Sequence, residues 1–211
     1  MKFSVASPLE LSLINRKNAI EDNDYDAFVN QLEIDISLQI SEIQGYSSLY
    51  FNKKEDEITI FLVSNLKSMG YYGSFHDTYH NGHVDLFIQD NRFKWLGECK
   101  LHAGNNYSEK GFKQLTTRYS DGHEFGNKGG ILIYNQLKTK KTLECMQEWH
   151  NHLNSDPAIQ QLDLKCLDID PENGRQYFDS THTHEKSGMP YKIRHFFINL
   201  SHNPQDKQSK V

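Results

Sequence analysis

Two runs of strand-forming residues, separated by a short polar turn, constrain the fold of this chain more than any other feature. Residues 82–88 and 93–100 are rich in aliphatic, aromatic and β-branched side chains, and the residues between them are types that reverse a chain. We therefore predict a β-hairpin. Because successive side chains of a strand point to opposite faces, Glu98 and Lys100 should share one face while Cys99 points into the core.

Pairing of these strands would bring two carboxylates and an ammonium group together. Asp85 and Glu98 could then share a Mg²⁺ or Mn²⁺ ion through oxygen ligands, with Lys100 beside them. The ion would activate water, and the ammonium group would stabilise charge on a phosphate or orient the nucleophile. The pattern indicates a metal-dependent phosphodiesterase, although an exposed hairpin with a solvated ion pair carries the same residue types.

A predicted helix precedes the hairpin. Residues 55–69 carry apolar side chains at helical spacing, and Gly70 is a suitable C-terminal cap. The first turn holds Glu55, Asp56 and Glu57. We expect Glu57 to reach the metal site; the alternative for each acid is a favourable interaction with the helix dipole alone.

A second predicted helix, residues 107–119, follows the hairpin, with a serine cap and apolar residues at helical spacing. Gln114 and Arg118 are four residues apart and should lie on one face of it. An amide and a guanidinium there could hold a phosphate backbone. Both residue types are also ordinary on a helix surface.

The order of these elements resembles the PD-(D/E)xK, or restriction-endonuclease-like, nuclease family. The resemblance covers residues 50–136: a helix, the strand with Asp85, the strand with Glu98, the second helix, and a strand at 131–134. It implies an α/β fold with a restriction-endonuclease-like core, in which helices flank a central mixed β-sheet. It also implies hydrolysis of phosphodiester bonds in nucleic acid, with DNA favoured over RNA as the substrate, and with Mg²⁺ or Mn²⁺.

The resemblance assigns a role to each site residue. The implied metal ligands are Asp85, Glu98, Glu57 and the backbone carbonyl of Cys99. Lys100 would serve the nucleophile, and Gln114 would support the site from the following helix.

One motif strengthens the resemblance, and one residue departs from it. Gln114, Leu115 and Tyr119 resemble the Gln-and-Tyr helix motif of one large branch of the family. Val84 stands where many members have a proline, although many others lack that proline too. The family includes members that have lost activity, but every expected acid and the lysine are present here.

Length and composition fit one catalytic domain with additions. The 211 residues are 36% hydrophobic and 12% aromatic, enough for one sizeable core. We expect a helical extension at residues 1–49 packed on the core, a nuclease-like domain at 50–202, and a flexible tail at 203–211.

Charge limits how the chain could bind nucleic acid. A formal net charge of −5 shows no global basic surface. Affinity for DNA, the expected partner, must therefore come from local groups such as Lys94, Lys110, Lys113, Arg118 and Lys128. The expected nucleic-acid contacts are Lys113, Arg118 and Tyr119. A homodimer or a protein partner is compatible with the sequence, because no separate DNA-reading domain is visible.

The rest of the chain predicts further helices and strands. Apolar spacing predicts helices at 25–49 and 141–153 and strands at 162–169 and 191–200. Three widely spaced cysteines, Cys99, Cys145 and Cys166, favour reduced, buried thiols. With no apolar leader and no segment long enough to span a membrane, we expect a cytoplasmic protein without membrane contact.

Eleven histidines raise the alternative of a structural zinc site. The candidate groups are His150 with His152, His182 with His184, and the trio His76, His80 and His83. No cysteine pair accompanies them, and His76 and His80 fall in a predicted loop, so their spacing alone does not support a site. His83 should share the strand face of Asp85 and is a possible neighbour of the metal site.

A non-catalytic protein is the competing interpretation. In that case the chain would be a nucleic-acid-binding or assembly module of a larger defence, repair or mobile-element system that retains the nuclease fold. Apolar residues left exposed on the N-terminal helix would favour this interpretation.

Overall fold

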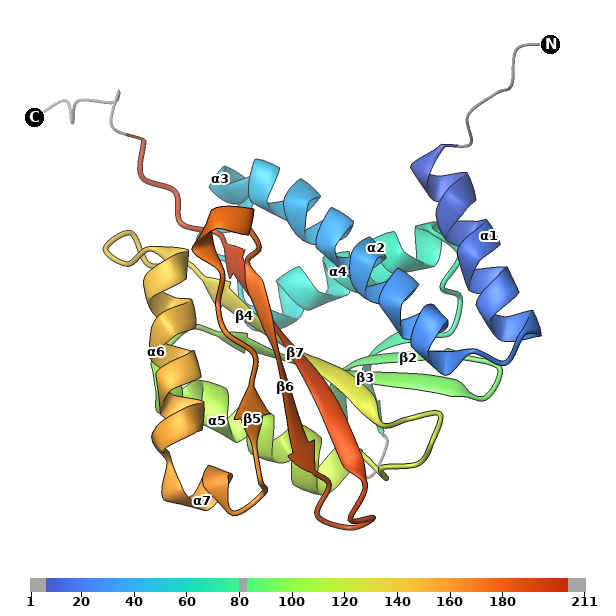
Figure 1. The fold of residues 1–211 in the computed structure, drawn as a ribbon. Helices are drawn as coiled ribbons and strands as arrows, with labels where there is room; N and C mark the ends of the chain where they lie inside the picture. The colour runs from blue at the N-terminus through green and yellow to red at the C-terminus, as the bar shows by residue number, and fades with distance from the viewer. Residues whose placement is uncertain (1–6, 80–82, 205–211) are drawn as a thin grey trace, which may run out of the picture.

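The computed structural model describes residues 7–79 and 83–204, within which seven strands form one mixed, open sheet with helices on both faces (Figure 1). The strand order is β1-β2-β3-β4-β7-β6-β5. The predicted α/β class, with N-terminal helices and a central mixed sheet flanked by helices, is confirmed. Among the described residues, no helix is both long and apolar enough to cross a membrane.

The strands combine antiparallel edges with a parallel centre. Their bounds are β1 (Ser74–Tyr79), β2 (His83–Asp90), β3 (Phe93–Leu101), β4 (Lys128–Asn135), β5 (Lys165–Cys166), β6 (Tyr177–Thr183) and β7 (Pro190–Asn199). Strands β1, β2 and β3 pair antiparallel, β3, β4 and β7 pair parallel, and β7, β6 and β5 pair antiparallel. The parallel centre is covered by helices on both faces, as parallel sheets generally are.

The helices divide between the two faces of the sheet (Figure 1). On one face lie α1 (Pro8–Glu21), α2 (Tyr25–Gly45), α3 (Ser47–Tyr50) and α4 (Glu55–Ser68). The other face carries α5 (Asn105–Lys113), the π-helical turn η1 (Gln114–Tyr119), α6 (Thr142–Ser155) and α7 (Pro157–Gln160). A short 3₁₀ turn, η2 (Pro171–Asn173), precedes β6. Each face has its own hydrophobic core.

The predicted hairpin is confirmed as β2 and β3. Their pairing runs from Leu86 opposite Gly97 to Asp90 opposite Phe93. Asn91, in the turn, has a φ of 53°, a left-handed conformation that asparagine tolerates better than most residues. The regular alternation along β3 then fixes which side chains face α5 and which face α4.

The long N-terminal helix packs on the sheet through the residues that its periodicity predicts. In α2, Asp24 caps the first turn, and Phe28, Leu32 and Ile36 are fully buried in the core that also contains Trp95 of β3. The helix ends at Gly45, before the predicted end at residue 49, because α3 begins a separate turn at Ser47.

Several elements differ from the prediction. His76 lies in β1 rather than in a loop, and the predicted strand at 162–169 is reduced to Lys165–Cys166, which pairs only with β6 at the sheet edge. The predicted helix at 107–119 begins at Asn105 and changes to π-helical hydrogen bonding at Gln114. The helix α1 and the strand β6 were not predicted, and His80 and residues 205–211 lie outside the described residues.

Candidate active site

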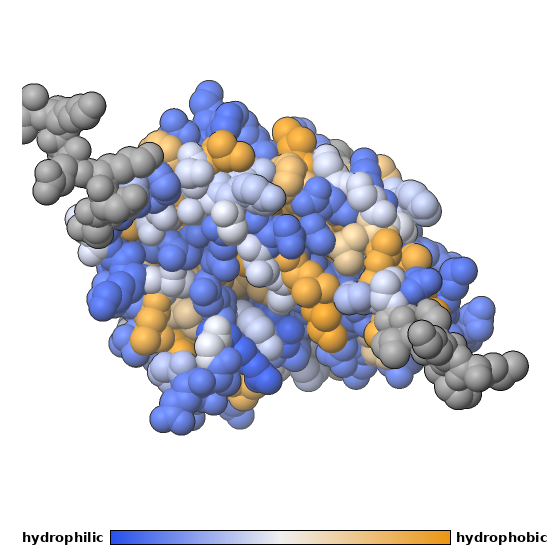
Figure 2. Space-filling model, turned by 90° about the horizontal axis from the view of Figure 1, so that it is seen from above, coloured by the Kyte–Doolittle hydropathy of each residue, from blue (hydrophilic) through white to orange (hydrophobic). Residues whose placement is uncertain are grey.

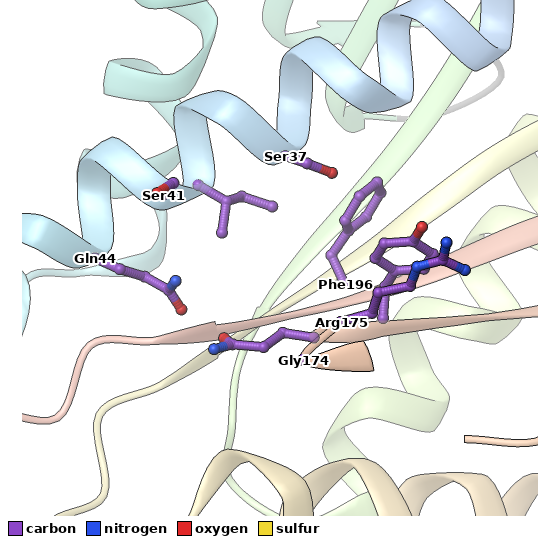
Figure 3. A pocket seen from close by; sticks show the side chains of 9 residues that line it. Ser37, Ser41, Gln44, Gly174, Arg175 and Phe196 are labelled. Atoms are coloured by element: carbon purple, nitrogen blue, oxygen red, sulfur yellow. The ribbon is translucent and has the colours of Figure 1, made fainter. Parts of the chain in front are cut away.

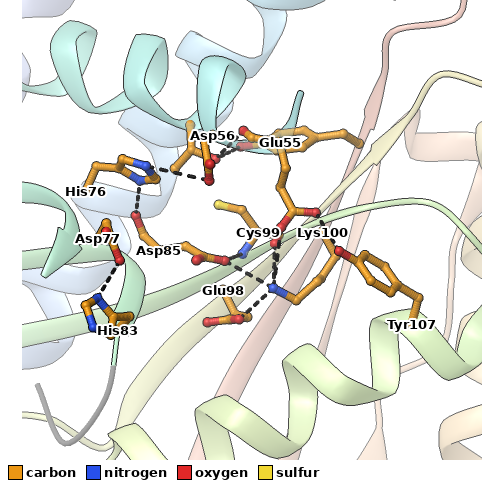
Figure 4. Close-up of polar contacts among 12 residues, drawn as sticks. Glu55, Asp56, His76, Asp77, His83, Asp85, Glu98, Cys99, Lys100 and Tyr107 are labelled. Carbon is orange, nitrogen blue, oxygen red and sulfur yellow. Dashed lines mark hydrogen bonds and ion pairs between the residues drawn. The ribbon is translucent and has the colours of Figure 1, made fainter. Parts of the chain in front are cut away.

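The amino group of Lys100 lies at the centre of four oxygen donors (Figure 4). Its Nζ atom is 2.7 Å from Glu98 Oε1, 2.9 Å from the carbonyl oxygen of Cys99, 3.2 Å from Asp85 Oδ2 and 3.6 Å from Glu55 Oε1. We call Glu55, Asp85, Glu98 and Lys100 the acid–lysine cluster. These four side chains come from α4, β2 and β3, so tertiary packing is what brings them together.

The end of the β2–β3 pairing positions Asp85. Regular pairing stops at Leu86 and Gly97, and beyond that point Asp85 Oδ2 accepts a hydrogen bond of 2.9 Å from the Cys99 N–H. Glu98 and Lys100 are two residues apart in β3 and point to the same face, while Cys99 is buried in the core on the opposite face. The predicted meeting of Asp85, Glu98 and Lys100 is therefore present in the structure.

Helix α4 contributes Glu55, not the predicted Glu57. Glu55 Oε2 accepts a hydrogen bond of 2.6 Å from the Leu101 N–H at the end of β3 and lies 3.5 Å from the hydroxyl of Tyr107. Glu57 points away from the cluster: it accepts hydrogen bonds from the Lys53 ammonium group and the Lys54 N–H, and nearly half of its side chain is exposed. The expectation for Glu57 was wrong because this residue caps its own helix.

The sequence held a signal for Glu55. The buried face of α4 contains Ile58, Thr59 and Leu62. Glu55 precedes Ile58 by three residues and Thr59 by four, which places it on the same face of the helix, whereas Glu57 is about 200° around the helix from Glu55. The phase of the hydrophobic pattern therefore distinguishes the two acids.

Burial and the crowding of like charges raise the pKa values of two acids of the cluster, Glu98 and Glu55. Desolvation, and then the neighbouring Asp85 carboxylate, raise the pKa of Glu98 to about 8, against the opposing effect of Lys100. Burial also raises the pKa of Glu55, again opposed by Lys100. Burial alone would lower the pKa of Lys100, but Glu98 and Asp85 raise it well above its usual value, so its amine stays protonated.

One oxygen of the cluster lacks a partner. Glu98 is 1% exposed, and its Oε2 atom is buried without a hydrogen-bond partner among the described residues. Burying a carboxylate oxygen without a hydrogen-bond partner costs free energy unless a cation binds to it. Together with Asp85, Glu55 and the Cys99 carbonyl, it forms a set of oxygen donors suited to Mg²⁺ or Mn²⁺. The residues present therefore fit such an ion, with Lys100 able to compete for its place.

Helix α5 covers the cluster through a glycine. A Cβ atom added at Gly111 would lie 3.0 Å from Cγ of both Glu98 and Lys100. A contact this short is tighter than almost all Cβ contacts in proteins, so Gly111 lets the helix backbone lie closer to the two site residues than another residue would without displacing them. A glycine in mid-helix is unfavourable by about 1 kcal/mol, and this contact supplies the reason for it.

The π-helical turn after α5 changes how its residues face each other. Its hydrogen bonds run from one residue to the fifth along, so Gln114 and Tyr119 become neighbours, and Gln114 Nε2 donates a hydrogen bond of 3.1 Å to the Tyr119 hydroxyl. The turn expected to be α-helical is therefore π-helical, and the amide of Gln114 is directed at Tyr119. Tyr119 is 1% exposed and packs in the core, which contradicts its predicted contact with nucleic acid.

Tyr119 nevertheless lies within the electrostatic influence of Glu98. Burial, and then the charge of Glu98, raise the pKa of Tyr119. Lys113 and Arg118 are exposed, as expected for residues that contact a ligand, but Lys113 forms an ion pair with Glu109.

Strand β1 supports the site from the sheet edge. His76 Nδ1 lies 2.9 Å from the backbone oxygen of Asp85, and its Nε2 faces Asp56 at 3.8 Å (Figure 4). His83, the expected neighbour of the site, instead pairs with Asp77 at 2.8 Å and is exposed. The role of His76 was missed because β1 itself was not predicted.

A separate pocket lies between α2 and the far end of the sheet (Figure 3). Its volume is about 220 Å³, and Ser37, Ser41 and Gln44 of α2 face Arg175 and Phe196 across it. The lining contains no acidic residue and no histidine. The acid–lysine cluster is therefore the stronger candidate for an active site. No protein-family model, curated protein or solved structure matches the chain.

Proposed function

We propose that the protein is a metal-dependent nuclease with a restriction-endonuclease-like core, which hydrolyses phosphodiester bonds of nucleic acid. One observation carries the proposal: three carboxylates and a backbone carbonyl from separate elements all contact a single cation, the Lys100 ammonium group. Convergent oxygen donors around a cation, with one buried carboxylate oxygen unpartnered, are what a divalent metal site requires.

The ligands we propose are Asp85, Glu98, Glu55 and the carbonyl oxygen of Cys99. Glu55 takes the role that was expected for Glu57. Bound there, Mg²⁺ or Mn²⁺ would lower the pKa of a water molecule and stabilise negative charge on phosphate oxygens. With all groups ionised, three carboxylates face one ammonium group, which leaves a net charge of −2 to attract the ion.

Charges and hydrogen bonds within the site orient the reacting groups and hold the ligands in place. Lys100 carries a protonated amine that can stabilise charge on a phosphate oxygen or orient the attacking nucleophile. Glu55 is fixed by the Leu101 N–H, and Asp85 by the Cys99 N–H, so the carboxylates are held before substrate arrives. Gln114 and Tyr119 support the adjoining turn through their hydrogen bond.

The substrate class follows from the chemistry of the site and its surroundings. A hard cation beside an ammonium group acts on phosphate esters, and the exposed Arg118, in the turn that follows α5, could contact a nucleic-acid backbone. DNA remains the proposed substrate, ahead of RNA, on the resemblance to the nuclease family. The net charge of −5 predicts modest affinity that falls with salt.

The test is cleavage by the purified protein and its Asp85→Asn variant. Substrates are circular and linear, single- and double-stranded DNA and RNA, each with Mg²⁺, Mn²⁺ or EDTA. We expect metal-dependent cleavage that drops by at least about 100-fold in the variant, since a lost group in an active site commonly costs ~10²–10³ in rate. Equal cleavage by the variant, with its fold intact by circular dichroism, would contradict the proposal.

Two acids of α4 provide a matched comparison. Glu55→Gln should lower the cleavage rate, because it removes a carboxylate that contacts Lys100, whereas Glu57→Gln should leave the rate within about twofold, because Glu57 is an exposed cap. Both variants remove one charge from the same helix turn. A larger loss in Glu57→Gln than in Glu55→Gln would return the role to the residue expected from sequence.

A non-catalytic, partner-bound module is the second candidate, and one observation favours it. Helix α1 buries Ser12, Arg16 and Ala19 but leaves its apolar Leu9, Leu11 and Ile14 about half exposed. Figure 2 shows hydrophobic patches among hydrophilic ones on the face seen from above. Absence of cleavage on every substrate, in a folded protein that binds Mn²⁺, would favour this candidate.

A further inference from the structure

We infer that Glu109, His152 and Asp156 form a second metal site, for a transition ion such as Zn²⁺, which links α5 to the C-terminal end of α6. One ligand atom from each residue can be chosen so that all three lie within 4.8 Å of one another. His152 Nε2 is 2.8 Å from Glu109 Oε2. The inference is independent of the proposed nuclease activity.

The donor set determines the class of ion. An imidazole nitrogen with two carboxylate oxygens suits Zn²⁺ and related transition ions, whereas Mg²⁺ and Ca²⁺ prefer oxygen alone. Three protein ligands would leave a position for water. This chemistry differs from the oxygen-only donors of the acid–lysine cluster.

The ligand side chains are held in place before an ion binds. Glu109 and His152 are 15% and 18% exposed, and the His152 ring stacks on Trp149 with its centroid 5.5 Å away. Asp156 Oδ1 accepts the N–H groups of Ala158 and Ile159. Those bonds hold the carboxylate through Oδ1 and do not use Oδ2.

A metal ion can bond to all three ligand atoms at once, whereas a proton can join only two of them. When His152 is neutral, its Nε2 lone pair and both carboxylates can all donate electrons to one centre. A proton on Nε2 provides one hydrogen bond, to Glu109, but none to Asp156. The carbonyl end of α6 adds a second attraction for a cation, because His152 lies in the last turn of that helix.

Both carboxylates are ready to bind at neutral pH. The ion pair with Lys113 lowers the pKa of Glu109, and the hydrogen bond from the Ile159 N–H lowers the pKa of Asp156. Lys113 is the competing cation at Glu109, but it contacts Oε1, whereas His152 faces Oε2. One carboxylate oxygen therefore remains directed at the site.

The site lies away from the acid–lysine cluster. Gly111 packs against Glu98 and Lys100, and Glu109, two residues earlier in α5, lies about 200° around the helix. Helices α5 and α6 contact each other directly, and Asn105 also donates a hydrogen bond to the backbone of α6. An ion between them would fix α5, the helix that rests on the candidate active site.

The test is Zn²⁺ binding by the full chain after removal of metals with a chelator, measured by isothermal titration calorimetry. We expect a saturable site that is present both in the unmodified protein and in Glu98→Gln, in which the acid–lysine cluster is disabled. His152→Gln should weaken binding by at least about tenfold, or ~1.4 kcal/mol. His150→Gln, a matched change that instead affects a contact with the Leu167 backbone, should leave Zn²⁺ binding unaltered.

Three results would overturn the inference. These are no saturable Zn²⁺ binding, equal affinity in His152→Gln and the unmodified protein, or loss of binding in Glu98→Gln instead. If His152→Gln fails to fold, Asp156→Asn replaces it, because the amide oxygen of asparagine still caps α7 while the charge that attracts the ion is removed. Equal Zn²⁺ affinity in Asp156→Asn would then decide against the site.

Discussion

At the scale of single residues, the protonation of Glu98 governs the candidate active site. This carboxyl is buried beside Asp85, and its pKa is raised to about 8. Lys100 remains charged, so near neutral pH a proton and a metal ion compete for Glu98. The residue that most needs a cation is thus also the one that most readily keeps a proton.

We therefore expect Mn²⁺ affinity at this cluster to rise with pH. Below the pKa of about 8, binding must release the Glu98 proton, so affinity should fall by up to about tenfold per pH unit between about pH 8 and about pH 6. Titration calorimetry at several pH values measures this. Glu98→Gln should bind weakly and lack this pH dependence. A flat profile for the unmodified protein would show that Glu98 is not a ligand.

At the scale of elements, α5 and the hairpin form the site by close contact. Gly111 brings the α5 backbone against Glu98 and Lys100, and the end of the β2–β3 pairing leaves the Cys99 N–H for Asp85. Helix α4 adds Glu55 at its first turn. Each element contributes one constraint, and the close position of α5 depends on the absence of a side chain at Gly111.

Gly111→Ala should disturb the position of α5 on the site. The added methyl group would lie only 3.0 Å from Cγ of Glu98 and of Lys100, and both are held by the cluster, so we expect a loss of about 1–3 kcal/mol in the free energy of unfolding, despite the better helix propensity of alanine. Mn²⁺ affinity should fall as well. Urea unfolding and calorimetry measure the two effects. The control is Gly45→Ala in α2, where a Cβ meets nothing within 4 Å and stability should hold or rise slightly. Identical behaviour of the two variants would refute the packing argument.

At the scale of the whole molecule, buried histidines tie stability to pH. His182 and His195 lie in the core between the sheet and α5 and α6, and burial lowers their pKa values to about 4 and about 3. Both ring nitrogens of His182 are without a hydrogen-bond partner among the described residues. His195, in contrast, bonds to Trp149 and Ser180. Protonation of either ring would place a charge in an apolar core.

Stability should therefore fall as the pH drops below about 6.5, where these histidines gain protons in the unfolded chain but not in the folded one. The loss is on the order of 1–2 kcal/mol per histidine between about pH 7 and about pH 5. Urea unfolding should be done in Glu98→Gln, because Glu98, with its raised pKa, contributes with the opposite sign. His182→Phe should reduce the loss, and an unchanged loss would exclude His182 as its source.

Much of the candidate site followed from local sequence patterns. Alternation along residues 93–100 and the polar turn before them predicted the hairpin and the shared face of Glu98 and Lys100, as observed. Helical spacing predicted α2, α4 and α6 to within a few residues of their ends. These are properties of neighbouring residues, because the strand and helix periods fix directions within one element.

Other features depended on packing between distant elements. Three contacts each join residues on different elements. They are the contact of Glu55 with Lys100, the support of Asp85 by His76, and the meeting of Glu109 with His152. The π-helical turn likewise brought Gln114 against Tyr119, and Tyr119 became part of the core.

The sequence by itself determined which elements form and which way their side chains point, because periodicity and turn chemistry act over a few residues. Only the tertiary structure decided which acid of α4 joins the cluster, that the oxygen donors surround Lys100, and that α5 rests on a glycine. The physical reason is that such contacts form between surfaces from separate elements. Their distances are set by how the sheet and helices pack, which no single stretch of sequence encodes.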